Sequence, residues 1–65
     1  MDEKLKAQIE AAIAEETADS EKYMKLADEA GDKYAPILRD IAHEELTHKK
    51  YLQEIHDDMT KKINS

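Results

Sequence analysis

The chain has 65 residues, no cysteine, and 16 Asp and Glu against 10 Lys and Arg, for a formal charge of -6. This composition excludes disulfides and thiolate-bound zinc or iron, and its negative field repels nucleic acid and anionic lipid. No apolar run approaches the roughly 20 residues of a membrane span, and the charged start of the chain lacks the apolar segment of a signal peptide. We therefore expect a cytoplasmic protein with no membrane or nucleic-acid partner.

Two long helices joined by one turn account for the pattern of the chain. Frequent Ala, Glu, Lys and Leu, with one Gly and one Pro, are typical of helices. Gly31 suits the left-handed position that ends a helix, Asp32 suits the cap of the next helix, and Pro36 suits its first turn. We predict one all-α domain that folds as an antiparallel helical hairpin. Its expected parts are a helix at about 2–30, a turn at 31–35 and a helix at about 36–62, within a domain of residues 1–65.

Each predicted helix carries a seam, spaced in alternating steps of four and three, that is apolar at its ends and polar in its middle. In the first helix the seam consists of Leu5, Ile9, Ala12, Glu16, Asp19, Tyr23, Leu26 and Ala30. In the second helix it consists of Leu38, Ile41, Glu45, His48, Leu52, Ile55 and Met59. This period predicts that both seams face the core. Ionisable side chains are therefore expected in the middle of the core.

The polar seam positions are predicted to lie at one level of the hairpin. Glu16 lies 15 residues before Gly31, or about 22 Å of helix at 1.5 Å per residue. The midpoint of Glu45 and His48 lies at a similar distance beyond the turn. The Glu-x-x-His spacing also puts a carboxylate and an imidazole side by side on one helix face. We therefore expect these three side chains to converge.

One chain supplies two carboxylates and one imidazole, which is sparse for a metal site. Two hairpins paired about a two-fold axis would form a four-helix bundle with four Glu and two His, the ligand set of di-iron carboxylate proteins. Divalent cations would neutralise carboxylates that are costly to bury alone. Oxygen and imidazole ligands suit iron or manganese, with zinc and cobalt as substitutes. We therefore predict a homodimer whose di-iron centre has Glu16, Glu45 and His48 as metal ligands.

The segment HEELTH, residues 43–48, resembles the zinc protease motif H-E-x-x-H. That motif needs two histidines four residues apart on one helix face. His43 and His48 are five residues apart and diverge by about 140° around a helix. A zinc protease site is therefore excluded, and we expect His43 at the surface.

The motifs of these two helices resemble those of the ferritin-like superfamily, and in particular those of the rubrerythrins and the encapsulated ferritins. The resemblance is carried by Glu16-x6-Tyr23 in the first helix. In the second helix it is carried by Ile41-Ala-x-Glu-Glu-x-x-His48, followed by Tyr51-Leu52. It extends over about residues 9–56.

The resemblance implies a function and an assembly. Encapsulated ferritins have two-helix subunits that form a ferroxidase centre between chains, assemble into rings of dimers and dock inside an encapsulin shell. The implied function is Fe(II) oxidation by O2 for iron storage or detoxification, although the chain ends at Asn64-Ser65 without a recognisable shell-targeting tail. One alternative is rubrerythrin-like peroxide reduction with an external electron donor. The other is a non-catalytic metal-binding or structural helical module.

Three further residues are candidates for roles near the centre. The resemblance matches Tyr23 to a tyrosine close to the metal, and Glu15 to an acidic neighbour on the path by which metal reaches the site. Tyr23 is equally interpreted as a packing aromatic residue. Asp19 lies on the flank of the seam, where it is either a solvated residue or an accessory metal ligand.

Overall fold

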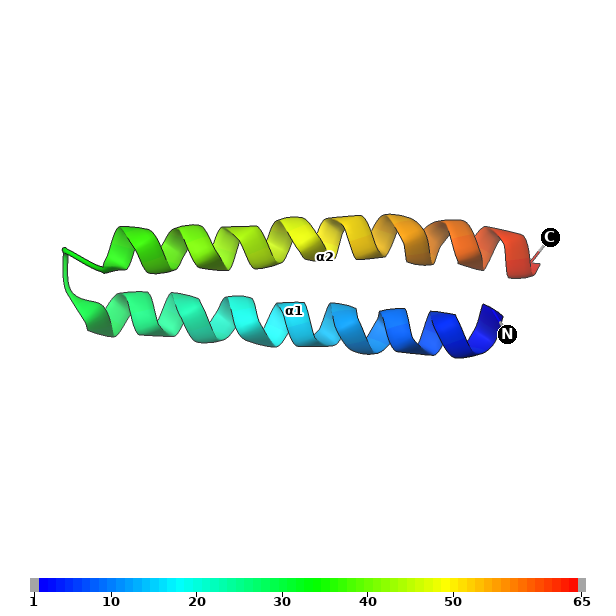
Figure 1. Ribbon diagram of the computed structural model, residues 1–65, viewed down its shortest axis with the longest axis horizontal. Helices are drawn as coiled ribbons and strands as arrows, with labels where there is room; N and C mark the ends of the chain where they lie inside the picture. Colours follow the sequence, from blue (N-terminus) through cyan, green and yellow to red (C-terminus); the bar gives the residue numbers. More distant parts are fainter. Residues whose placement is uncertain (1, 65) are drawn as a thin grey trace.

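The computed structural model describes residues 2–64 of the chain, and the side chains of residues 3–61. Two helices, α1 (Asp2–Ala30) and α2 (Ala35–Asn64), run antiparallel and lie side by side along their whole length (Figure 1). The predicted all-α hairpin is confirmed, with no strand among the described residues. Neither helix, over those residues, is long and apolar enough to cross a membrane.

The turn between the helices depends on Gly31. Its φ of 78° is in the left-handed region, which glycine adopts at low cost and which commonly ends a helix. The N–H of Ala35 donates to the carbonyl of Gly31 at 3.0 Å, so α2 begins directly after the turn. Pro36 lies in the first turn of α2, as expected. The expected cap is wrong, because α2 begins three residues after Asp32, whose exposed side chain makes no hydrogen bond to any described residue.

The interface between the helices is built from small side chains. The molecule measures 50 × 15 × 12 Å, and its smallest dimension is about one helix diameter. No large side chain among the described residues is fully buried. Small residues let the two backbones approach closely, and the buried side chains are Ile9, Ser20, Ala27, Ala35 and Ala42. The hairpin is therefore a single layer of helices whose interior is too thin to form a large core.

The seam predicted to face the core is only partly covered in the hairpin. Leu5, Leu26 and Ile55 are 50%, 41% and 47% exposed, so a single hairpin does not bury the whole seam. The physical reason is that the stripe is wider than one helix-helix contact. The exposed part of the stripe and the neighbouring Tyr34 and Ile37 leave one side of the hairpin apolar and uncovered.

We call this side the open face. Its members lie on one side of the two helices, because Leu26, Tyr34 and Ile37 line one common hollow, and because Ile37 and Ile55 are 18 residues apart, which is five full helical turns. The open face consists of Leu5, Leu26, Tyr34, Ile37, Ile41, His48, Leu52 and Ile55. Exposed apolar strips commonly mark surfaces at which proteins bind partners.

We predict that Gly31→Ala destabilises the hairpin by about 1 kcal/mol, because an L-residue is strained at the left-handed φ of Gly31. A steric clash adds nothing, since an added Cβ would have no atom within 4 Å. Urea unfolding followed by circular dichroism measures the difference. The matched control is Asp32→Ala, which should leave stability unchanged; an equal loss in that variant would show that Asp32 caps α2 after all.

Candidate metal centre

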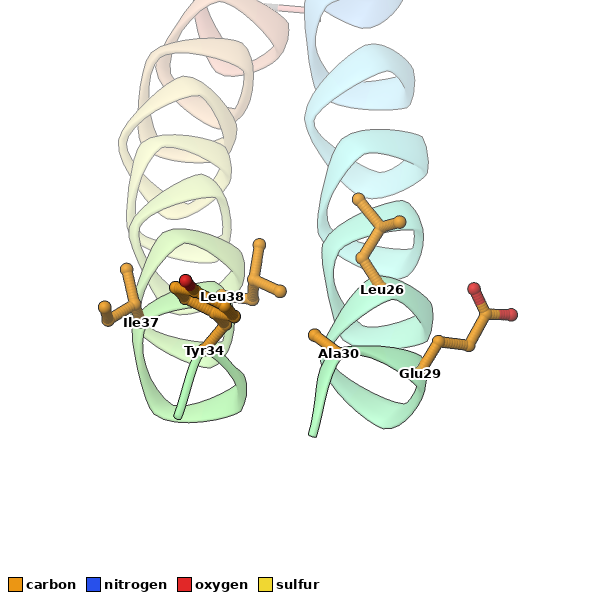
Figure 2. A pocket seen from close by; sticks show the side chains of 6 residues that line it. All are labelled: Leu26, Glu29, Ala30, Tyr34, Ile37 and Leu38. Atoms are coloured by element: carbon orange, nitrogen blue, oxygen red, sulfur yellow. The ribbon is translucent and has the colours of Figure 1, made fainter. Parts of the chain in front are cut away.

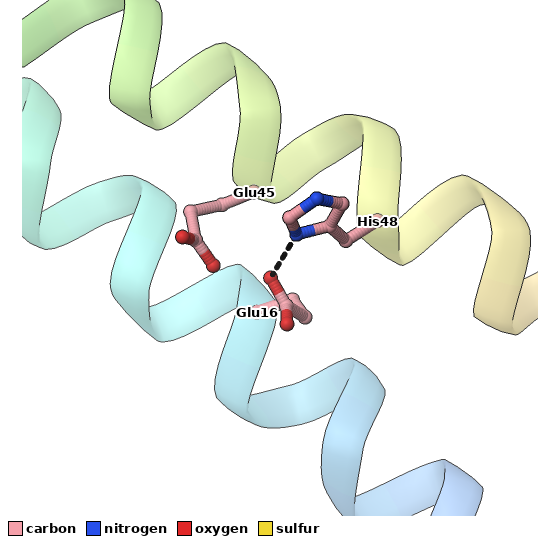
Figure 3. A group of neighbouring side chains, drawn as sticks. All are labelled: Glu16, Glu45 and His48. Atoms are coloured by element: carbon pink, nitrogen blue, oxygen red, sulfur yellow. Dashed lines mark ion pairs between the residues drawn. The ribbon is translucent and has the colours of Figure 1, made fainter.

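The middle of the hairpin brings together the three residues predicted as metal ligands. Glu16 extends from α1, and Glu45 and His48 extend from successive turns of α2 toward it (Figure 3). One potential ligand atom from each residue lies within 4.8 Å of those of the other two. The two carboxylates are half-buried and the imidazole is exposed. The convergence follows from helix rise and antiparallel pairing, so it needs no unusual backbone geometry.

The Glu16 carboxylate lacks a full set of partners. Its Oε2 atom is buried and, with the neighbouring carboxylate ionised, has no hydrogen-bond partner among the described residues. The nearby Nδ1 of His48 lies 3.7 Å away, which is an ion-pair distance and too long for a hydrogen bond. Buried oxygens without partners are rare in folded proteins and usually indicate a site for an ion, a proton or water.

The pKa of Glu45 is raised above its ordinary value. The largest cause is a hydrogen bond between Glu45 and Glu16, followed by desolvation of Glu45 and by the negative charges of Glu16 and Asp19. The positive charge of protonated His48 acts in the opposite direction and lowers this pKa. The net result is that the Glu45 carboxyl group gives up its proton less readily than an ordinary glutamate does.

The other predicted site residues lie around this group and outside it. Asp19 is half-buried and close enough for its charge to act on Glu45, whereas Glu15 is exposed. Tyr23 is half-buried, seven residues or about 10 Å of helix from Glu16, and Lys22 Nζ lies 5.0 Å from the centre of its ring. His43 is exposed, as expected.

The structure also shows a pair that the sequence analysis did not predict. Nε2 of His56 lies 3.0 Å from Oε2 of Glu10, at hydrogen-bond distance. The other ring nitrogen of His56, Nδ1, lies 3.9 Å from Oδ1 of Asp57. This pair joins the helices near their free ends. The sequence contained a signal for this pair. Residues equally far from the turn, on either side of it, lie at one level of the hairpin, and residues 10 and 56 are nearly equally far from it.

The geometry of Glu16, Glu45 and His48 fits a divalent transition metal. Metal–oxygen and metal–nitrogen bonds are about 2.0–2.2 Å long, so two ligand atoms on one ion lie up to about 4.2 Å apart. Small side-chain rotations bring atoms within 4.8 Å of one another to that separation. Two carboxylates and an imidazole on facing helices are half of the ligand set of a di-metal carboxylate bundle. The fold and the site therefore define a ferritin-like helical hairpin.

Comparison with known proteins agrees with this class. The sequence profile of the Rubrerythrin family matches residues 8–65, which is most of the chain. The protein therefore belongs to the rubrerythrin family of the ferritin-like superfamily. No curated protein and no solved structure matches the chain.

We predict that Glu45→Gln makes the metal-free protein more stable at neutral pH. Because the folded state raises the pKa of Glu45, the stabilisation from its bound proton is present at acidic pH and is lost as pH rises through the raised value. Glutamine removes this loss, since its amide can donate to Glu16 at any pH. Thermal unfolding in chelator at several pH values measures the effect, which should shrink as pH falls.

The matched control for this prediction is Glu44→Gln. It removes the same charge from the adjacent, exposed position, so any effect of net charge alone should be equal in the two variants. Equal stabilisation by both substitutions, or a gain for Glu45→Gln that does not depend on pH, would show that the environment of Glu45 is not the cause.

Proposed function

We propose that the protein is a ferroxidase, which oxidises Fe(II) with O2 at a di-iron centre formed by two copies of the Glu16, Glu45 and His48 group. The observation that carries the proposal is that one ligand atom from each of these three residues lies within 4.8 Å of the other two, beside the open face to which His48 belongs. Family membership supports iron as the metal. The absence of cysteine leaves oxygen and nitrogen donors, which suit iron.

A second copy of the chain is part of the proposal. Three donor groups leave an iron ion with incomplete coordination, and the His48 side chain is 57% exposed on the open face. A second hairpin on that face would cover the imidazole and supply the other half of the ligand set, giving four carboxylates and two imidazoles. This is the arrangement of the encapsulated ferritins, which the motifs resemble.

In this function Fe(II) is the substrate, and the residues bind it and neutralise its charge. Four carboxylates would balance the four positive charges of two Fe(II) ions. Each iron gives one electron, and O2 accepts two electrons and two protons to form hydrogen peroxide. A metal ion competes with a proton for Glu45, because a ligating carboxylate must be ionised. His48 directs Nδ1 toward the carboxylates (Figure 3).

Iron oxidation can be tested with the ligand variants. We expect His48→Ala to oxidise Fe(II) about tenfold more slowly than the unchanged protein, or slower still, when an anaerobic Fe(II)-loaded sample meets air. His43→Ala is the matched control, since it removes an exposed histidine from the same helix, and it should oxidise Fe(II) normally. Native mass spectrometry should find two irons per two chains, and only in the protein with intact ligands. Equal oxidation rates in the unchanged protein and His48→Ala would remove the proposal.

Peroxide reduction is the second candidate, and membership of the rubrerythrin family favours it. The same ligands would serve, with H2O2 accepting two electrons and two protons to give two water molecules. A stopped-flow comparison of Fe(II)-loaded protein mixed with O2 or H2O2 separates the candidates. We expect O2 to oxidise the iron at a rate comparable to H2O2; a strong preference for H2O2 would favour the peroxidase function.

A further inference from the structure

The hollow near the free ends of the helices has polar side chains in its walls. Its volume is about 460 Å³, and the residues that line it are Glu10, Ile13, Gln53, His56 and Asp57. The hollow of similar size at the turn end, whose side chains Figure 2 shows, is almost entirely apolar. Donor atoms suited to a cation are therefore gathered in the first hollow and are scarce in the second.

Glu10 and His56 already have the separation of two ligands on one ion. Oε2 of Glu10, on α1, lies 3.0 Å from Nε2 of His56, on α2. Two atoms that are each bonded to a metal at about 2.1 Å, at a right angle to each other, lie about 3.0 Å apart. A divalent cation could therefore take the place of the hydrogen between these two atoms with little movement of either helix.

Gln53 and His56 repeat the spacing of Glu45 and His48. In both pairs the first residue lies three positions before the histidine, which puts the two side chains on one face of α2. The first residue of the second pair is an amide, whose carbonyl oxygen is a metal ligand that carries no charge. The donors in the hollow are thus one carboxylate, one imidazole and one amide oxygen, a set that suits a divalent cation such as Zn²⁺.

Asp57 is placed to orient the imidazole of His56. Its Oδ1 atom lies 3.9 Å from Nδ1, the ring nitrogen that the Glu10 contact does not use. Metal-binding histidines commonly donate the second ring N–H to a carboxylate, which fixes the tautomer and makes the other nitrogen a better ligand. A small side-chain rotation would bring Asp57 to hydrogen-bond distance. Asp57 is therefore a positioning residue and not a ligand.

We propose that Glu10, Gln53 and His56 bind a divalent cation at a second site, which ties the free ends of the two helices together. His56 lies eight residues beyond His48, which is about 12 Å along α2 and about 80° around it, so the two sites are separate. A cation bound to both helices stabilises the folded hairpin, because the unfolded chain does not hold these ligands together. Such a tie matters in a short chain with no large, fully buried side chain among its described residues. The second site does not depend on the proposed oxidation of iron.

Zinc binding by a chain that lacks the first ligand group tests the second site. Glu45→Gln and His48→Ala are combined in the whole chain, and Zn²⁺ is titrated into this double variant by calorimetry and native mass spectrometry. We expect one zinc ion per chain to remain bound. Adding His56→Ala should weaken that binding about tenfold or more, whereas adding His43→Ala, at an exposed position of the same helix, should leave it unchanged. Absence of zinc from the double variant, or equal binding with and without His56, would overturn the inference.

A stability measurement separates metal binding from the hydrogen bond alone. His56→Ala removes both, so it should lower the melting temperature of the double variant even in chelator. Zn²⁺ at ten times its Kd should raise the melting temperature of the double variant by about 5 °C or more, and this rise should disappear when His56→Ala is added. An equal rise with and without His56 would show that zinc acts elsewhere on the chain, and would overturn the inference.

Asp57→Asn tests the positioning role in the same double variant. We expect its zinc affinity to fall about tenfold while the number of bound zinc ions stays at one, because every ligand is retained. The matched control is Glu54→Gln, which removes one negative charge from an exposed position of the same helix and should leave the affinity nearly unchanged. Equal falls in the two variants would assign the effect to net charge and remove the role of Asp57.

Discussion

The candidate site depends on one interaction, which is the close approach of the Glu16 and Glu45 carboxylates in the middle of the helix pair. Glu16 and Glu45 are half-buried and close enough for a hydrogen bond between them to raise the pKa of Glu45. Two ionised carboxylates within hydrogen-bond distance repel each other, and both side chains here are partly shielded from water. A cation near the two carboxylates would offset this repulsion, so the central turns of both helices are suited to binding one.

This interaction links metal binding to protonation and to stability. Because the folded state raises the pKa of Glu45, protonation of Glu45 stabilises the metal-free hairpin at acidic pH, and this stabilisation is lost as the pH rises. A divalent cation offers a larger compensation and displaces the proton. The net charge of -6 also favours the approach of cations from solution. A protein with a more stable metal-free state would need weaker electrostatic repulsion here, and would therefore bind metal less well.

Much of this arrangement could be predicted from the sequence, because helices have a fixed rise and a fixed period. Gly31 and Pro36 located the turn, and counting 1.5 Å per residue from it placed Glu16 at the level of Glu45 and His48. The start of α2 was less predictable, since the local hydrogen bond from Ala35 to Gly31 replaces the expected cap by Asp32. Such a choice depends on turn geometry, which one sequence specifies only weakly.

The sequence could not show which part of each seam lies between the two helices. A heptad-like stripe is wide enough to serve two contacts, one within the hairpin and one with a further layer, and periodicity alone does not divide it. For this reason the sequence could not show that Leu5, Ile55 and His48 are exposed in the single hairpin. Their place in the core of a two-hairpin bundle stays a prediction.

The separation of the two sides of the hairpin has a consequence for how the centre could work. On the side that the open face does not use, the Glu10–His56 hydrogen bond joins the helices near their free ends without involving any of the three ligand residues. The turn joins them at the other end. The ligand-bearing middle of the hairpin therefore lies between two contacts that involve none of its ligand residues. Neither contact has to break when Glu16, Glu45 and His48 bind a cation.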